Sequence, residues 1–420
     1  MSSTVFNAAY NARARNRFAQ LGVTLIELMI AMVIGLMIVA AIGYIYLQGR
    51  TGYKAQDAQS RMQEEMRLAV DVMTRDLQLA GRFGCTRALD RSSTEPDAST
   101  TVRLAGVHPY MTANSGTWLE KDGDSTNSNT SVDVSQLLRG YENGAGWRAS
   151  AAMASARLAG TDTITLVRGG DDETHVSNFL PEGEKAIIQT IEPTTRTLFG
   201  AGTGGNDARL LVVSNCKSAY VVKADIKNNG DITFDNTLNP TPVDAAIQSA
   251  APAGIPSSLR TPLDVVTVTT FSPVSYHIGT SATSTLPTLF RTEVMESGPP
   301  LGQIGLWGTP QPLVSGVENM RVRFSVNATD TATGRVFLTP SEINAAQVAG
   351  QPNVWLSVAA AEITLTVISE DANVRTKSEA QTAQGVTTTD ARLRRVIRFV
   401  VETRNTGRDA AKSVRNQGDL

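Results

Sequence analysis

The chain has 420 residues, of which 41% are apolar and 19% charged, so it can bury a sizeable core in one large or two modest domains. Its formal net charge of −2 gives no electrostatic case for nucleic-acid binding. The 34 glycines, 17 prolines and 5% aromatic residues fit a loop-rich β domain better than a helical bundle.

A basic, polar segment, residues 1–22, precedes a long apolar run. Arg13, Arg15 and Arg17 lie before the run, and Glu27 is its only charged residue between positions 23 and 47. A helix of about 25 residues is about 37 Å long, enough to cross a hydrocarbon core of about 30 Å with some tilt. We therefore expect a membrane span with the arginine side in the cytoplasm.

Two residues distinguish this run from an ordinary anchor. Gly22 lies before the apolar run, whereas the cleavage site of a secretory signal follows it, so cutting after Gly22 would leave the span on the mature protein. Glu27 lies about one turn into the run, where a carboxylate costs about 2.5 kcal/mol or somewhat less, and it should therefore have a partner. Cleavage would create an α-ammonium group on Val23, and this group on a neighbouring copy would neutralise Glu27. We interpret Glu27 as an assembly residue.

The residues from Gly22 to Met29 (GVTLIELM) resemble the processing site of type IV prepilins. The resemblance implies that a prepilin peptidase cuts after Gly22 and methylates Val23, which replaces the usual phenylalanine. It also implies that Glu27 guides docking into a filament. A plain signal anchor with an accidental glutamate is the alternative.

The apolar run continues into an amphipathic segment, so we expect one helix of about 55 to 60 residues that ends at Gly81 or Gly84. Residues 23–47 would be its membrane half and residues 48–81 its amphipathic half. Apolar side chains recur in the second half at steps of three and four: Ala58, Met62, Met66, Ala69, Met73, Leu77 and Ala80. We expect this stripe to pack on a sheet, the alternative being a methionine-rich groove for a partner.

Residues 82–420 are predicted to form a β-rich head. Residues 91–150 are polar and lack periodicity, so we expect a surface excursion with a short helix near 134–139. The expected strands are residues 162–168, 186–191, 209–214, 220–226, 231–234, 264–271, 275–278, 289–294, 321–326, 361–369 and 394–404. Their alternating pattern favours an antiparallel sheet, hence an α+β, pilin-like fold, with a subdivision of the head near the proline-rich residues 240–262.

Later segments resemble PilW-type minor pilins, namely residues 79–85 (LAGRFGC), Asn215 with Cys216, residues 313–320 (LVSGVENM) and residues 394–405. The resemblance implies a minor pilin in a priming or tip complex with other minor pilins, the major pilin and a PilY-type tip adhesin, supporting twitching motility or adhesion. It implies an inner-membrane, single-pass protein with a periplasmic head, later carried on the pilus at the cell surface.

Two other functions remain open. A minor pseudopilin of a type II secretion or DNA-uptake machine would share the same N-terminus. A membrane-anchored periplasmic enzyme or binding domain would gain nothing from a carboxylate in the bilayer, so Glu27 argues against it.

The sequence predicts no enzyme, no cofactor and no metal site. His108, His175 and His277 form no ligand pair and are expected to be surface or hydrogen-bonded residues. The acidic run Asp171, Asp172 and Glu173 favours a solvated turn over a calcium site, and residues 225–231 (DIKNNGD) favour a hairpin.

Cys85 and Cys216 are the only cysteines. In an oxidising compartment we expect them to form a disulfide, with two free buried thiols as the alternative.

Overall fold

The computed structural model describes residues 23–84, 86–87, 107–109, 119–120, 132–133, 137–182, 185–190, 199, 207–214, 219–227, 229–235, 266–280, 284–294, 307–326, 336–348, 354–372, 374, 381–383, 386–388, 390 and 392–403. The chain divides into residues 1–56 and residues 57–420, and each unit is considered by itself.

A single helix, α1 (Leu25–Leu79), forms the N-terminal part of the described chain. It ends as the sequence predicts, because Gly81 takes a left-handed φ of 74° and stops the helix. Every side chain from Val23 to Arg50 is exposed in the isolated chain. In the second half all seven residues of the predicted stripe, Ala58 to Ala80, are buried, which confirms that the methionines belong to a core.

Two antiparallel sheets meet α1. The first has five strands in the order β16-β15-β14-β7-β6. Their bounds are β6 (Leu138–Tyr141), β7 (Thr163–Leu166), β14 (Val274–Thr280), β15 (Pro287–Glu293) and β16 (Gln311–Ser315). The second has four strands in the order β18-β17-β19-β22. Their bounds are β17 (Val317–Val326), β18 (Phe337–Leu338), β19 (Val358–Ile368) and β22 (Arg394–Glu402).

Gly316 connects the two sheets between β16 and β17. Its φ is +75°, and a Cβ at this position would lie 2.7 Å from the carbonyl oxygen of Ile368. A side chain would therefore be strained and would collide with β19. This explains the glycine in the LVSGVENM segment.

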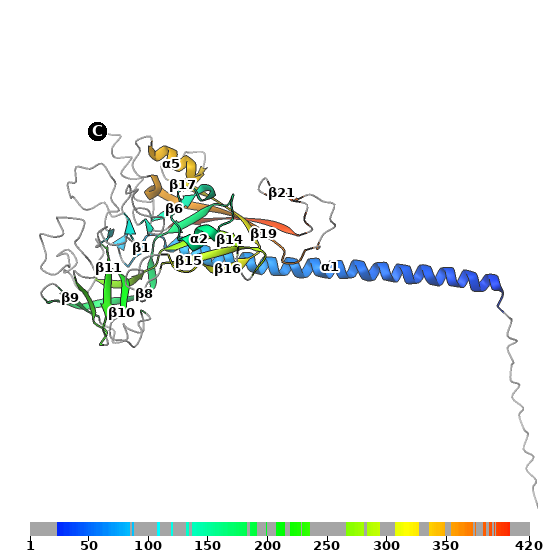
Figure 1. Ribbon diagram of the computed structural model, residues 1–420, viewed down its shortest axis with the longest axis horizontal. Helices are drawn as coiled ribbons and strands as arrows, with labels where there is room; N and C mark the ends of the chain where they lie inside the picture. Colours follow the sequence, from blue (N-terminus) through cyan, green and yellow to red (C-terminus); the bar gives the residue numbers. More distant parts are fainter. Residues whose placement is uncertain are drawn as a thin grey trace, which may run out of the picture. The chain divides into compact units, whose positions relative to one another are not determined.

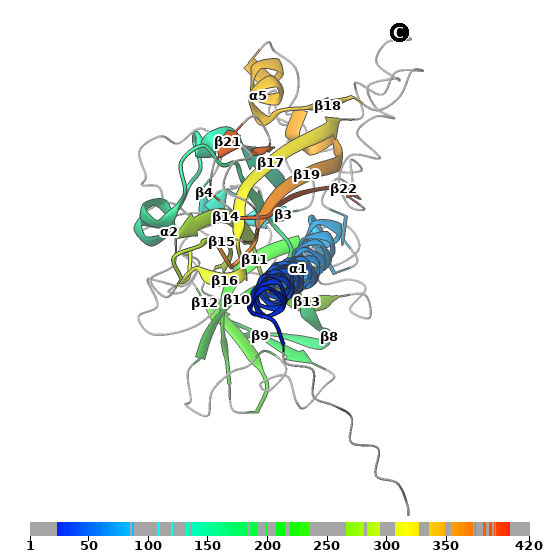
Figure 2. The ribbon, with the colours of Figure 1, turned by 90° about the vertical axis from the view of Figure 1, so that its right-hand side faces the viewer.

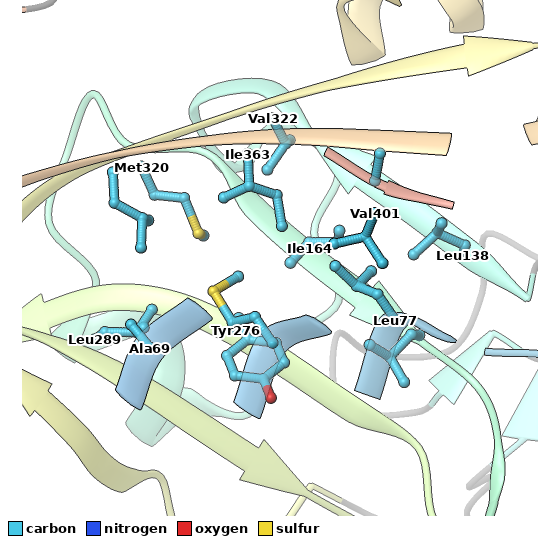
Figure 3. Packing of buried hydrophobic residues seen from close by; sticks show 14 of the residues in the cluster. Ala69, Leu77, Leu138, Ile164, Tyr276, Leu289, Met320, Val322, Ile363 and Val401 are labelled. Atoms are coloured by element: carbon cyan, nitrogen blue, oxygen red, sulfur yellow. The ribbon is translucent and has the colours of Figure 1, made fainter. Parts of the chain in front are cut away.

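One hydrophobic core unites the second half of α1 with both sheets. Figure 3 shows Ala69 and Leu77 of the helix beside Tyr276 of the five-stranded sheet and Met320 and Ile363 of the four-stranded sheet. All five residues are fully buried. The amphipathic half of α1 is thus an integral part of the head.

A third sheet closes on itself. Six strands pair in the order β10-β13-β8-β9-β12-β11, and β11 pairs again with β10. Their bounds are β8 (Gly169–Glu182), β9 (Lys185–Thr190), β10 (Asp207–Ser214), β11 (Ala219–Ile226), β12 (Ile232–Asp235) and β13 (Thr267–Phe271). We call this ring the closed sheet. In both views β8, β9 and β10 lie together, apart from β17 and β19 (Figure 1 and Figure 2).

The remaining described elements are short: β1 (Arg82–Phe83), β2 (Thr86–Arg87), β3 (Val107–Pro109), β4 (Leu119–Glu120), β5 (Val132–Asp133), η1 (Glu142–Gly144), α2 (Ala151–Ala156), α5 (Pro340–Val348), η6 (Val354–Ser357), β20 (Gln381–Ala383) and β21 (Val386–Thr388). Only β3 with β11 and β4 with β5 pair in parallel among the described strands.

The α+β class with antiparallel sheets is confirmed, and two expectations need correction. The helix expected near residues 134–139 is wrong for its described part, because Leu138 begins strand β6, which pairs with β7. The acidic run lies inside strand β8 and not in a turn. The interval 240–262, where a subdivision is expected, lies outside the described residues; β13, which follows it, pairs with β8 and β10.

Candidate functional site

The N-terminus of α1 is built around Thr24 and Glu27. The Glu27 carboxylate Oε2 accepts hydrogen bonds from the Thr24 amide and hydroxyl groups, both at 3.0 Å. The Glu27 amide in turn lies 3.3 Å from the Thr24 hydroxyl oxygen. This reciprocal arrangement is a capping box, in which two side chains satisfy amide groups that a helix start leaves without partners.

Glu27 therefore has a hydrogen-bonding partner at the start of its own helix, in addition to the one expected on a neighbouring copy. The signal was present, because Thr24-Leu25-Ile26-Glu27 has the spacing of a capping box directly before an apolar run. Among the described residues, Oε1 of Glu27 accepts no hydrogen bond, so one carboxylate oxygen is still available.

Of the two predicted processing residues, Gly22 lies outside the described residues, and Val23 is 71% exposed.

An apolar surface covers the first half of α1. Exposed side chains of this surface include Leu25, Ile26, Leu28, Met29, Ile30, Val33, Ile34, Leu36, Ile38, Val39 and Ile42. Among the described residues, α1 is the one helix long and apolar enough to cross a membrane. A surface of this size requires lipid or other apolar helices around it, so this part of the chain is a membrane anchor.

The second half of α1 carries a buried carboxylate. Asp76 is 3% exposed, and its Oδ2 accepts hydrogen bonds from the Tyr276 hydroxyl at 2.5 Å and from Arg291 Nε at 2.8 Å. Its other oxygen, Oδ1, lies 3.3 Å from Nη2 of Arg168, which is also buried. The helix is thus joined to β14, to β15 and to the residue that precedes β8.

The environment keeps these groups in the protonation states that the hydrogen bonds need. Burial, followed by the charge of Asp76, raises the pKa of the Tyr276 hydroxyl far above its usual value. Burial alone would lower the pKa of Arg291, but the hydrogen bond and charge of Asp76 outweigh it and raise the pKa. Tyr276 therefore remains a donor and Arg291 a cation.

The acidic run binds arginines. Asp171 pairs with Arg75 of α1 at 2.9 Å and with Arg168 at 3.4 Å, and Glu173 pairs with Arg82 at 3.6 Å. These contacts explain the acidic run without calcium. Among the described residues, no three His, Cys, Asp or Glu side chains form a group that could hold a metal ion.

The hairpin predicted at residues 225–231 is confirmed. Strands β11 and β12 pair across it, and the Lys227 ammonium lies 2.6 Å from Asp225 Oδ2. A lysine occupies the place where a calcium loop would require an oxygen ligand.

His277 departs from its expectation. It is fully buried beside Trp147 and Phe290, with ring centroids 5.1 Å and 5.3 Å away, and neither of its ring nitrogens has a hydrogen-bond partner among the residues that the structure describes. Burial, and secondarily the charge of Arg157, lowers its pKa to about 4, so the ring is neutral near pH 7. His175 is exposed, as expected.

Cys85 and Cys216 both lie outside the described residues. Their neighbours are in contact, because a Cβ on Gly84 would lie 2.4 Å from the hydroxyl oxygens of Ser214 in β10 and Thr267 in β13. Gly84 precedes Cys85, and Ser214 is two residues before Cys216.

Comparison with known families gives two matches. Residues 275–405 match the family described as Type IV Pilus-assembly protein W, a segment that runs from β14 to just past β22. Residues 17–43 match the prokaryotic N-terminal methylation motif. Comparisons with curated proteins and with solved structures gave no match.

The two matches agree with the geometry at both ends of α1. The methylation motif covers the capped helix start and most of the apolar surface, and the pilus-assembly match covers most of the strands on which the other half of α1 packs. The chain is therefore similar to the type IV pilus-assembly family W over residues 275–405 and to the prepilin-type methylation motif over residues 17–43.

Proposed function

We propose that this protein is a minor type IV pilin that a prepilin peptidase cuts after Gly22 and methylates on Val23. Before assembly it spans the inner membrane once, with its head in the periplasm. It then joins other minor pilins and the major pilin in a priming or tip complex, with a PilY-type adhesin as a further partner, in support of twitching motility or adhesion.

The observation that carries the proposal is the position of Glu27. It is the only charge on an otherwise apolar helix start. The capping box uses one of its oxygens, and Oε1 accepts no hydrogen bond from any described residue. A new ammonium group on Val23 of this or a neighbouring chain can bind that oxygen. An enzyme that only needs a tether has no use for such a group.

The size of the head supports a terminal position. The head contains three sheets, whose strands lie between residues 138 and 402, and it is carried by the single helix α1. A head of this size hinders repeated packing along a thin fibre. The match of residues 275–405 to a pilus-assembly family favours a pilus over a secretion or DNA-uptake machine.

Replacing Glu27 by leucine tests the assembly role in a strain whose pili depend on this protein. We expect Glu27→Leu to be inserted and shortened like the wild type, but to yield few or no pili. The matched control is Glu64→Leu, which removes an exposed carboxylate from the same helix outside the apolar run. Wild-type numbers of pili with Glu27→Leu would contradict the docking role.

We further propose that Cys85 and Cys216 form a disulfide that ties the end of α1 to the closed sheet. The support is the contact of Gly84 with Ser214 and Thr267. Non-reducing mass spectrometry of the intact protein should find one cross-linked peptide pair, and Cys85→Ser should remove it. Two free thiols in the untreated, exported protein would contradict the bond.

A further inference from the structure

The closed sheet interrupts a pair of neighbouring strands. Strand β7 ends at Leu166 and β14 begins at Val274, and these two residues are opposite each other in an antiparallel pair. The segment of the chain between Leu166 and Val274 contains the closed sheet and the connections between its strands. Without it, β7 and β14 would be the two arms of an ordinary hairpin.

The two ends of the closed sheet also meet. Gly169, the first residue of β8, pairs with Phe271, the last residue of β13. At the junction the Ser272 amide donates to the Arg168 carbonyl oxygen at 2.9 Å. The chain thus leaves the five-stranded sheet and returns to it at one place, which is the geometry of an inserted domain.

The interior of the closed sheet is separate from the main core. The hydrophobic cluster that contains α1 includes Leu166 and resumes at Val274, with no residue from 169–271. The closed sheet has its own fully buried side chains, among them Leu210, Val212, Ala224, Ile232 and Val268. Each part can therefore exclude water from its own interior.

The described contacts between the two parts include a strand pairing, ion pairs and an aromatic contact. Strand β3, outside residues 169–271, pairs with β11, and Gly84 contacts Ser214 and Thr267. The Arg75–Asp171 and Arg82–Glu173 pairs are exposed on at least one side, and such pairs contribute little to stability. The one described aromatic contact between them is Phe83 stacked on Phe271, with ring centroids 6.4 Å apart.

One family match shares the C-terminal boundary of the closed sheet. The match of residues 275–405 starts within β14, directly after the closed sheet, although it leaves β6 and β7 of the core unmatched as well. Apart from Asp171, which pairs with Arg75, the described strand residues of the core around α1 lie outside residues 169–271.

We propose that residues 169–271 are a separable module set into a complete pilin core, and that neither the folding of that core nor its incorporation into the pilus requires the module. The second half of this proposal, on incorporation into the pilus, rests on the proposed function. The first half, on the folding of the core, does not. On this proposal, the closed sheet makes contacts other than the contacts between subunits that build the filament.

The test replaces residues 169–271 of the full chain with the turn Asn-Gly and keeps Arg168, which binds Asp76. Because Cys216 is removed with the module, the variant also carries Cys85→Ser, and the full-length Cys85→Ser protein is the control. A second variant has a flexible six-residue Gly-Ser linker in place of Asn-Gly. We expect the shortened head to resist protease and to unfold cooperatively, and the cells to carry as many pili as the control.

Each outcome decides part of the proposal. If both shortened variants are degraded while the full-length control is stable, the closed sheet is part of the core and the proposal is overturned. If a shortened variant is folded but pili are lost, the module is needed for assembly and the second half is overturned. Loss of pili with Glu27→Leu is a separate result, because that variant keeps the closed sheet.

Discussion

The Asp76 carboxylate of α1 accepts a 2.8 Å hydrogen bond from Arg291 Nε of β15, where the carboxylate is buried and the guanidinium is partly exposed. The residues are far apart in sequence, so the bond fixes the helix against the five-stranded sheet. Tyr276 and Arg168 complete the surroundings of the carboxylate. A buried acid with three donors is a specific attachment of the helix, added to the non-directional contacts of the methionine stripe.

Replacing Asp76 by asparagine should destabilise the head strongly. The change removes the buried counter-charge of Arg168 and Arg291, whose other partners, Asp171 and Glu293, are partly exposed, and breaking a buried ion pair in this way costs about 3 to 5 kcal/mol. Urea unfolding of the full-length protein in detergent measures the loss. The control Asp71→Asn alters an exposed acid on the same helix and should change the free energy of unfolding by less than about 0.5 kcal/mol. Equal effects of the two substitutions would contradict the account.

Replacing Met66 by aspartate should prevent a folded head from accumulating. Met66 is 6% exposed within the core, where a carboxylate would be buried without a partner. Met66→Leu keeps the volume and should cost less than about 1.5 kcal/mol. Immunoblots after mild protease treatment measure the folded fraction. A protease-resistant Met66→Asp protein at wild-type levels would show that the stripe is not needed in the core.

The helix and most strands were predictable because their signals are local. The stripe from Ala58 to Ala80 repeats at the helical period, Gly81 ends it, and alternating runs such as residues 361–369 mark strands, although both faces of β19 are largely buried. The GVTLIELM segment identifies the helix start in the same way.

The remaining features depend on contacts between distant segments. Asp76 is three residues after Met73 and four before Ala80, so its position on the buried face is visible in the sequence, but its partners come from β14, β15 and Arg168. The closed sheet was not predicted, because ring closure depends on the pairing of β10 with β11 and β13. Strand β8 contains the consecutive acids Asp171, Asp172 and Glu173, which resemble a loop in the sequence because the arginine partners of Asp171 and Glu173 are not visible there.

Two conservative substitutions distinguish the role of Glu27 in capping the helix from the role of its negative charge. Glu27→Gln keeps an oxygen that accepts from the Thr24 amide but removes the charge, whereas Thr24→Val keeps the charge and loses the hydroxyl. Loss of a cap costs about 1 kcal/mol, so Thr24→Val should retain pili at a reduced number. Glu27→Gln should lose them, as Glu27→Leu does. The reverse order, counted by electron microscopy, would assign the role of Glu27 to capping alone.

His277 should make the head less stable in acid. Its pKa is about 4 in the folded protein because of burial, against about 6.5 in an unfolded chain. Between these values the unfolded chain binds more protons, so stability falls as the pH falls from 6.5 to 4, by about 3 kcal/mol in total. His277→Phe should lose this slope, and the exposed control His175→Gln should keep it. Identical pH profiles of the free energy of unfolding for wild type and His277→Phe would refute the prediction.

Processing at Gly22 can be tested in the precursor. Replacing Gly22 by tryptophan should leave the full-length chain in membranes, because a peptidase that cuts after glycine cannot accept the larger side chain. Gly22→Ala is the milder control and should be cut at least in part. Immunoblots that resolve the loss of residues 1–22 measure the outcome. Complete shortening of Gly22→Trp would place the cut elsewhere.

The most direct measurement is the N-terminus of the protein recovered from sheared pili, determined by mass spectrometry. The account predicts a chain that begins at Val23, carries an N-terminal methyl group and is found together with other pilin subunits. A chain that begins at Met1, or one that is never found in the pilus fraction, would contradict it.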